Sequence, residues 1–236
     1  MTRVLVLVPT AFELRLLRPR IENLVSDTQS VVANCGFGPI AAGINTARLL
    51  QQHQPRRVIL AGIAGTFLER LAIGTAASFS QIGCYGIGAG SGSSFKTASE
   101  LGWNQWSESD EINRTGIECR GDVITLRKSL QRSSAVVGSS AVADDNRSLM
   151  LLTVCAASAD ETDASDKLKK FPDAAAEDME AWSVAMACCL NDTPLTVIRG
   201  ISNVAGVRDK TRWNIEGALT AVADVLLSQH DTFEGE

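Results

Sequence analysis

The feature of this sequence that most restricts its fold is a series of short apolar runs, several ending at proline or glycine, that alternate with helical patterns. Val4–Val8 contains only valine and leucine and stops at Pro9, and apolar residues recur at helical spacing from about Ala11. Runs without polar residues predict strands that are buried on both faces of a sheet. Further predicted strands are 31–35, 58–61, 123–126, 151–154 and 195–201, and the later predicted helices are 40–52, 173–190 and 211–229.

This alternation indicates an α/β fold in which a largely parallel sheet is covered by helices on both faces. No segment has the composition of an interdomain linker, so we expect one domain over residues 1–236. A glycine- and serine-rich stretch at 83–94, with the polar stretch that follows it, predicts an insertion or lid within about 86–113.

The composition argues against several classes of protein. Basic residues number 22 against 27 acidic ones, and only 5% of the residues are aromatic, neither of which is typical of nucleic-acid binding. No apolar stretch approaches the roughly 18 residues of a membrane span. The six cysteines form no CxxC pair and there are two histidines, which leaves little for a metal site. We therefore expect reduced cysteines and a cytoplasmic protein, with neither nucleic acid nor membrane as a partner.

Two glutamates stand where a ligand site is expected. Glu13 lies just past the carboxyl end of the first predicted strand, the edge at which open α/β sheets bind ligands. Its alternative role is that of an ordinary carboxylate in the first turn of a helix. Glu180 lies between Met179 and Ala181 in a predicted helix that is otherwise apolar there, and an unpaired charge is costly to bury. It is either a site residue or a paired structural glutamate.

Two glycine-containing loops also follow strands. Arg199–Asp209 starts at a strand end and carries Asn203, which is a candidate ligand contact or a simple turn residue. Gly36–Gly43 has the outline of a dinucleotide-binding turn, but its third glycine comes one place late and no acidic residue ends the next strand. We therefore predict a packing turn there and no nucleotide cofactor.

Taken together, these motifs resemble the nucleoside phosphorylase and nucleosidase superfamily over most of the chain, least well over 86–150. The branch they resemble most is that of the methylthioadenosine/S-adenosylhomocysteine nucleosidases. Within it, Arg199–Asp209 followed by Trp213 is similar to the futalosine hydrolase family, which cleaves hypoxanthine from futalosine on a route to menaquinone. The motifs, in order, are Glu13 with Leu-Arg-Leu-Leu-Arg, Cys35–Gly43, Gly62–Gly65, Met179-Glu180 and Ser202-Asn203.

The resemblance implies a three-layer α/β/α domain around a twisted mixed sheet, without cofactor or metal, assembled as a homodimer or larger homo-oligomer. It implies that Glu13 and Asn203 are catalytic: Glu13 holds and deprotonates a water molecule, and Asn203 faces the purine. Glu180 would bind the ribose hydroxyls and Met179 would pack on the sugar. The implied substrate-binding set is completed by Ala64, Gly65 and Arg208, the last facing a benzoate on the 5′ substituent or pairing with Asp209.

Two departures from the superfamily pattern refine the expected reaction. Leu60 and Ile63 stand where phosphorolytic relatives carry arginine and serine, which favours water over phosphate as the attacking group. Asn203 stands where the methylthioadenosine branch has aspartate, which weighs against adenine as the base. We predict hydrolysis of a purine nucleoside, with futalosine as the first candidate. The alternatives are a methylthioadenosine/S-adenosylhomocysteine nucleosidase, a purine nucleoside phosphorylase and a non-catalytic nucleoside-binding relative.

Overall fold

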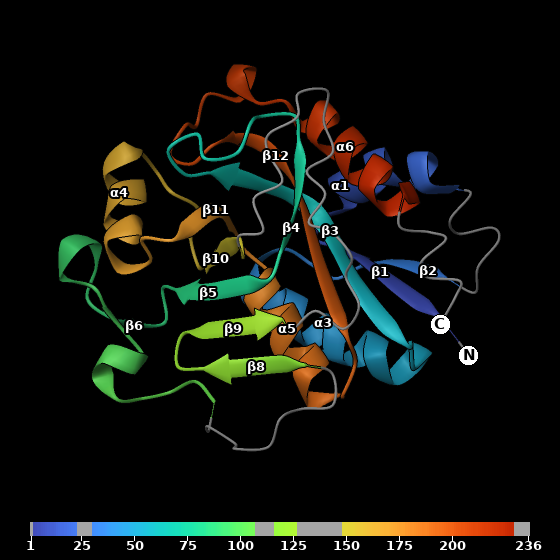
Figure 1. The fold of residues 1–236 in the computed structure, drawn as a ribbon, viewed down its shortest axis with the longest axis horizontal. Helices are drawn as coiled ribbons and strands as arrows, with labels where there is room; N and C mark the ends of the chain where they lie inside the picture. Colours follow the sequence, from blue (N-terminus) through green and yellow to red (C-terminus); the bar gives the residue numbers. More distant parts are fainter. Residues whose placement is uncertain (1, 23–29, 107–115, 127–147, 229–236) are drawn as a thin grey trace.

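The computed structural model describes residues 2–22, 30–106, 116–126 and 148–228, and its main feature is one large twisted sheet (Figure 1). The strands are β1 (Val4–Val8), β2 (Val31–Asn34), β3 (Arg57–Thr66), β4 (Ala76–Phe79), β5 (Gln81–Tyr85), β6 (Gly88–Ala89), β7 (Lys96–Thr97), β8 (Ile117–Arg120), β9 (Val123–Leu126), β10 (Met150–Val154), β11 (Ala174–Asp178) and β12 (Leu195–Val204). The α-helices are α1 (Ala11–Leu17), α3 (Gly38–His53), α4 (Glu161–Lys170), α5 (Ala181–Leu190) and α6 (Ile215–Ser228), and 3-10 turns cover 18–21, 92–94, 99–101 and 210–212.

The sheet is mixed, as expected. Its strands run in the order β2-β1-β3-β11-β10-β5-β9-β8, with β12 paired to β3 and β4 paired to β12. Pairing is parallel for β1 with β2 and β3, for β12 with β3, and for β10 with β5 and β11. The pairs β3–β11, β4–β12, β5–β9 and β8–β9 are antiparallel. Strands β6 and β7 form a separate small ribbon.

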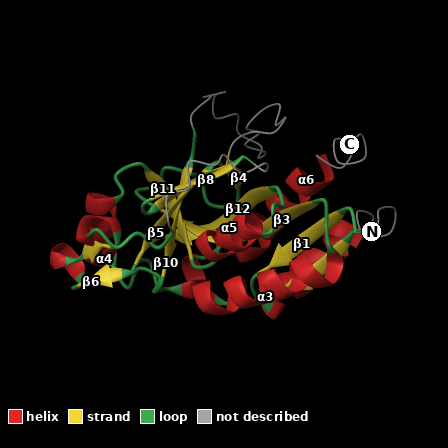
Figure 2. Ribbon diagram, turned by 90° about the horizontal axis from the view of Figure 1, so that it is seen from below, coloured by secondary structure: helices red, strands yellow, loops and turns green. Residues whose placement is uncertain are grey.

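Helices cover both faces of the sheet, which gives the predicted three layers (Figure 2). Successive side chains of a strand point to opposite faces, so a strand that is apolar throughout contributes to two cores. In β1, Leu5 and Leu7 pack with the core formed by α3 and α5, whereas Val4, Val6 and Val8 pack with the core of α1 and α6. A third cluster lies between β5, β10 and α4, around Leu152 and Phe171.

The predicted helix 173–190 is wrong in its first part. Residues Ala174–Asp178 form β11, which pairs with β10 and β3, and the helix begins only at Ala181. Alanine and glutamate favour helices locally, but the small Ala174–Ala176 side chains are all buried where β11 crosses the sheet. Tertiary packing therefore overrides the local preference, and Glu180 lies at the junction of strand and helix.

Other elements differ in extent from the predictions. Strands β3 and β12 continue to Thr66 and Val204, beyond the predicted ends at 61 and 201. Helix α6 begins at Ile215, four residues later than predicted, and its predicted end at 229 lies outside the described residues. Strands β4 and β5 and helix α4 were not predicted. No helix within the described ranges is long and apolar enough to cross a membrane.

Candidate active site

A cavity of about 530 Å³ opens where the carboxyl ends of β1, β10, β11 and β12 meet the second half of β3. Every residue that the sequence assigned to the site lines this cavity: Glu13, Ala64, Gly65, Met179, Glu180, Asn203 and Arg208. None of the lining residues comes from 86–106, the described part of the predicted insertion, while 107–113 lies outside the described residues. The ends of strands that are distant in sequence thus supply one site.

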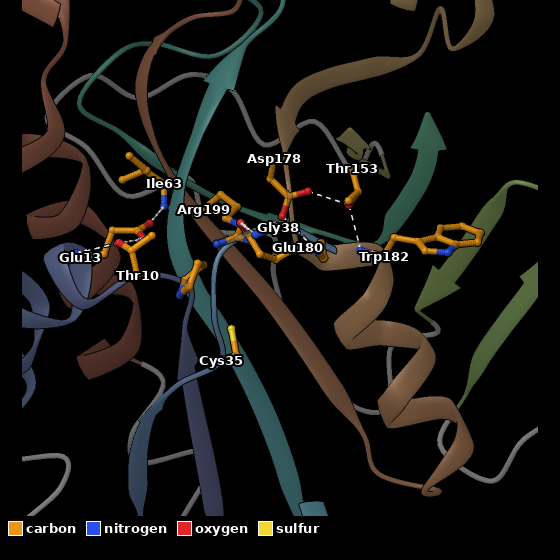
Figure 3. Close-up of polar contacts among 12 residues, drawn as sticks. Thr10, Glu13, Cys35, Gly38, Ile63, Thr153, Asp178, Glu180, Trp182 and Arg199 are labelled. Carbon is orange, nitrogen blue, oxygen red and sulfur yellow. Dashed lines mark hydrogen bonds and ion pairs between the residues drawn. The ribbon is translucent and has the colours of Figure 1, made fainter. Parts of the chain in front are cut away.

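Glu13 is fixed in the first turn of α1 by two donors. Thr10, the N-cap of the helix, donates its hydroxyl to Glu13 Oε2 at 2.5 Å, and the Ile63 amide donates to Oε1 at 2.9 Å (Figure 3). The Thr10 hydroxyl oxygen in turn accepts the Glu13 amide at 3.1 Å, as N-caps do. The side chain is 4% exposed and faces the cavity. Glu13 is therefore a rigidly held carboxylate at a helix N-terminus.

Glu180 occupies the N-cap position of α5, not the helix interior that the sequence suggested. Its Oε1 accepts the Gly38 amide at 3.1 Å, so the glycine turn before α3 presents its N–H to a carboxylate of this chain (Figure 3). Its Oε2 lies 3.3 Å from Arg199 Nη2. The side chain is 6% exposed and borders the cavity. It is thus a buried, paired carboxylate, yet one that faces the space for a ligand.

Arg199 is the buried cation between these two glutamates. It is fully buried, and its Nη2 forms ion pairs with Asp178 and Glu180. Its Nε and Nη1 have no hydrogen-bond partner among the described residues. Figure 3 shows Arg199 between Glu13 on one side and Asp178 with Glu180 on the other. An unpartnered buried N–H is costly, so the guanidinium depends for its stability on the charges of the carboxylates around it.

Gly62 allows the guanidinium and the Glu13 carboxylate to pack against the backbone of β3. A Cβ at this position would collide with Arg199 Nη1 and would lie 2.8 Å from Glu13 Oε1. The guanidinium and the Glu13 carboxylate therefore both approach the point that a side chain at residue 62 would fill. Glycine in the predicted Gly62–Gly65 motif is explained here by close approach of polar side chains, not by an unusual backbone angle.

Burial and charge shift the acidity of the groups in this cluster. Burial raises the pKa of Glu180 to about 7, with Arg199 opposing the shift and the Asp178 and Glu13 charges adding to it. Cys35, which is fully buried next to the cluster, has a pKa raised to about 12, chiefly by burial. A carboxyl group that titrates near neutrality inside a cavity is a common property of functional sites.

Asn203 lies at the end of β12 with its amide held on both sides. Ser202 donates its hydroxyl to Asn203 Oδ1 at 2.8 Å, and Asn203 Nδ2 donates to the Val204 carbonyl at 2.8 Å.

The loop that follows β12 packs tightly on the start of α4, because a Cβ at Gly206 would lie 2.5 Å from the Asp160 carbonyl oxygen. Gly206 also has a φ of +86°, which glycine tolerates best.

One of the two alternatives for Arg208, an ion pair with Asp209, is wrong. The Asp209 carboxylate accepts the amide and hydroxyl of Thr211, and the Arg208 guanidinium lies over the Trp213 ring at 5.6 Å. Trp213 and Lys210 line the cavity together with Arg208. This end of the cavity is therefore both basic and aromatic.

Sequence reasoning missed the residues that hold the site in place. Arg199 and Asp178 were given no role, although a single arginine within the apolar run 195–201 signals a buried cation that needs an acidic partner. Glu177 was also missed. It borders the cavity, and its two oxygens accept the amide and hydroxyl of Ser158 at 2.9 and 2.6 Å. In the part of the chain that the structure describes, no group of three or more acidic, histidine or cysteine side chains is arranged to hold a metal ion.

Comparison with known proteins supports the resemblance drawn from the motifs. A family model described as the Phosphorylase superfamily matches residues 127–228. Futalosine hydrolase from Streptomyces coelicolor is 26% identical over 81% of this chain and 74% of its own, and 5′-methylthioadenosine/S-adenosylhomocysteine nucleosidase from Geobacillus sp. is 23% identical over 92% of each. The nucleosidase of the same name from Colwellia psychrerythraea, solved in complex with adenine, has a TM-score of 0.72 at 18% identity, covering 98% of this chain and 96% of that one. The α/β fold is thus confirmed.

The raised pKa of Glu180 predicts a specific pH dependence of stability. Between about pH 4.5 and 7 the folded protein keeps a proton on Glu180 that the unfolded chain releases, so the free energy of unfolding falls as pH rises through this window. Glu180→Gln removes the titrating carboxyl group, so the free energy of unfolding should fall less with rising pH, by up to about 3 kcal/mol at pH 7. Urea unfolding between pH 4 and 8 measures it.

Glu161→Gln is the control for that experiment, since it makes the same change at an exposed residue of α4. Its pH dependence should match that of the unmodified protein. If the Glu180→Gln curve ran parallel to both, Glu180 would not be the group that holds the proton.

Proposed function

We propose that this protein is a purine nucleoside hydrolase that cleaves futalosine to hypoxanthine and dehypoxanthine futalosine. The observation that carries the proposal is a pair of buried carboxylates, Glu13 and Glu180, that face one cavity on either side of Arg199. Hydrolysis of an N-glycosidic bond requires a base for water and a negative charge near the sugar. The similarity to futalosine hydrolase and to the methylthioadenosine nucleosidases supports the same reaction class.

Glu13 is the general base. Its two oxygens are oriented by Thr10 and Ile63, and its carboxylate lines the cavity. A water molecule in the cavity donates a proton to Glu13 and attacks C1′ of the ribose. As the C1′–N9 bond breaks, the electron pair goes to the purine, which takes up a proton at N7 from solvent water, and Glu13 returns the proton it accepted to solvent. The proposal needs no metal and no cofactor.

Water suits this space better than phosphate does. Leu60 is fully buried and gives no polar side chain to the cavity, and Ile63 offers an apolar side chain while its amide is already used by Glu13. A phosphate dianion would meet the Glu13 carboxylate at short range, and like charges in a buried site repel strongly. These two features favour hydrolysis over phosphorolysis.

Glu180 and Met179 bind the sugar. The Glu180 carboxylate faces the cavity from the N-cap of α5 and can accept hydrogen bonds from the ribose hydroxyls. Once ionised, it also stabilises the positive charge that develops on the sugar ring in the transition state. Met179 offers a flexible apolar side chain beside it. Ala64 and Gly65 complete this wall of the cavity and leave room for the substrate.

Asn203 recognises the purine base by hydrogen bonding. With Oδ1 turned to Ser202 and one amide hydrogen given to Val204, the second amide hydrogen is available for an acceptor on the base. Hypoxanthine presents two such acceptors, O6 and N7, on one edge. An aspartate at this position would set acceptor against acceptor. The held orientation of the amide therefore favours a 6-oxopurine.

Arg208 faces the 5′ substituent. Its guanidinium is stacked on Trp213 and forms no ion pair with Asp209, and Lys210 adds a second cation to the same end of the cavity. A benzoate offers a carboxylate for a bidentate contact and a ring for the aromatic wall. This matches futalosine better than a nucleoside with a small apolar 5′ group.

The protein works as a homodimer or larger homo-oligomer. Phe37, Ile40 and Ile44 lie along one face of α3 and the turn before it, and they are 64%, 77% and 66% exposed. Phe12 is 47% exposed, and it lines the cavity together with Phe37. Exposed apolar patches of this kind mark interaction surfaces.

The second candidate is a methylthioadenosine/S-adenosylhomocysteine nucleosidase. It is favoured by the curated relative of that name, which matches 92% of the chain, and by the adenine-bound structure with the same fold. Asparagine can also pair with adenine, accepting from N6 and donating to N7, so Asn203 permits this substrate. A purine nucleoside phosphorylase and a non-catalytic nucleoside-binding protein are the remaining alternatives.

Product analysis with futalosine, methylthioadenosine and inosine, each with and without phosphate, tests the proposal. We expect hypoxanthine and a free sugar from futalosine, at a rate that phosphate does not raise. Adenine from methylthioadenosine at a higher kcat/KM would favour the second candidate. A sugar 1-phosphate would indicate a phosphorylase, and tight binding without turnover of any of the three would indicate a binding protein.

Asn203→Asp tests the reading of the base. We expect a loss of hypoxanthine–nucleoside cleavage, up to roughly 10⁴-fold in kcat/KM, with smaller losses or a gain on 6-amino substrates. Asn191→Asp makes the same change at the C-cap of α5, outside the cavity lining, and should leave the preference for 6-oxo over 6-amino substrates unaltered. A variant Asn203→Asp that still preferred the 6-oxo substrate would show that this residue does not select the base.

A further inference from the structure

The hydrogen bonds of the buried acidic cluster are divided unequally among its three carboxylates. Glu13, Asp178 and Glu180 are all at least nine-tenths buried, and Arg199 is the cation between them. Three buried negative charges against one positive charge are costly, so one carboxyl group of the cluster is favoured to hold a proton. The distribution of donors decides which one.

Asp178 has the largest share of those donors. Its Oδ1 accepts the Thr153 hydroxyl at 2.6 Å, and its Oδ2 accepts the Ala181 amide at 2.9 Å as well as Arg199 Nη2. Thr153 is itself fixed, because its hydroxyl oxygen accepts the Trp182 amide at 2.9 Å. These contacts tie β10, β11 and the start of α5 to one carboxylate. Asp178 therefore binds the guanidinium more closely than Glu180 does.

Glu180 accepts fewer and longer hydrogen bonds than Asp178 does. It accepts one amide, from Gly38 at 3.1 Å, and Arg199 Nη2 lies 3.3 Å from its other oxygen. The other charged or titratable groups near it are Glu13 of α1, Asp178 of β11 and the Cys35 thiol after β2. Burial and two neighbouring negative charges raise its pKa, as described above.

We infer that Asp178 is a positioning residue: by holding Arg199 it leaves Glu180 as the carboxyl group that takes up and releases the proton of this cluster. The consequence of this inference for catalysis rests on the proposed function. A protonated Glu180 reduces the net negative charge of the cluster, and it must ionise before it can stabilise positive charge on the sugar. Asp178 thereby sets the pH above which the site becomes active, although it does not act on the substrate through its own atoms.

Asp178→Asn tests this inference with little change of shape. The amide can turn its oxygen to Ala181 and Arg199 and donate its NH₂ group to the Thr153 hydroxyl oxygen, which reverses the direction of the Thr153 hydrogen bond, keeps the same partners and removes the charge. In this variant Glu180 is the carboxylate that remains paired with Arg199, and one negative charge next to Glu180 is removed. The midpoint at which Glu180 ionises should fall by about 1 pH unit. It is measured without substrate, by the pH titration of ¹³C-labelled glutamate carboxyl groups, and Glu180→Gln identifies the signal.

Asp163→Asn is the matched control, because it removes an aspartate that pairs with Lys167 of α4 and forms no hydrogen bond or ion pair with Arg199 or Glu180. The midpoint at which Glu180 ionises in this control should equal that in the unmodified protein. In the enzyme assay, the acid limb of kcat/KM should move to lower pH by the same amount in Asp178→Asn, whereas a merely structural role would lower the rate without moving the midpoint.

The inference is overturned if Asp178→Asn leaves the Glu180 midpoint unchanged or raises it. It is also overturned if the signal that titrates near neutral pH in the unmodified protein persists in Glu180→Gln, a test that holds even if Asp178→Asn does not fold. Since the titration uses no substrate, it is independent of the proposed function, whose failure would show as no turnover of any nucleoside.

Discussion

The interaction on which the site depends is the buried guanidinium of Arg199. It comes from the middle of β12, is fully buried, and is paired with Asp178 at the end of β11 and with Glu180 at the N-cap of α5. A cation in this position is stable only if the strands bring carboxylates to it. The pairing of β3 with both β12 and β11 does so. The sheet therefore serves to bring together charges from distant parts of the sequence.

The remaining parts of the site are arranged around this charge cluster. Glycine at position 62 lets Arg199 and Glu13 approach each other, and the Gly38 amide supports Glu180 from the other side. Two further parts of the cavity wall are built separately, by Asn203 at the end of β12 and by Arg208 and Trp213 in the loop after it, and we propose that they face the base and the 5′ substituent. A nucleoside bound in this way would meet charged groups at its sugar, a neutral amide at its base, and basic and aromatic groups at its 5′ end.

The sequence was informative where one local pattern had one physical cause. The apolar run Val4–Val8 predicted β1 because only a doubly covered strand can be apolar on both faces, and the position of Glu13 after it followed. Local pattern failed at Ala174–Asp178, where alanines typical of a helix form a strand because the sheet needs small side chains. The roles of Arg199 and Asp178 depend on a contact across 21 residues between two strands, which no local spacing indicates.

The central claim is that Glu13 activates water while the rest of the cavity binds the nucleoside. Glu13→Gln tests it most directly, since the amide can still accept from Ile63 or Thr10 but cannot take a proton. The account predicts a kcat lower by about 10²–10⁴-fold with futalosine, and a dissociation constant within a few-fold of that of the unmodified protein. A Glu13→Gln variant that retained near-normal kcat would contradict it.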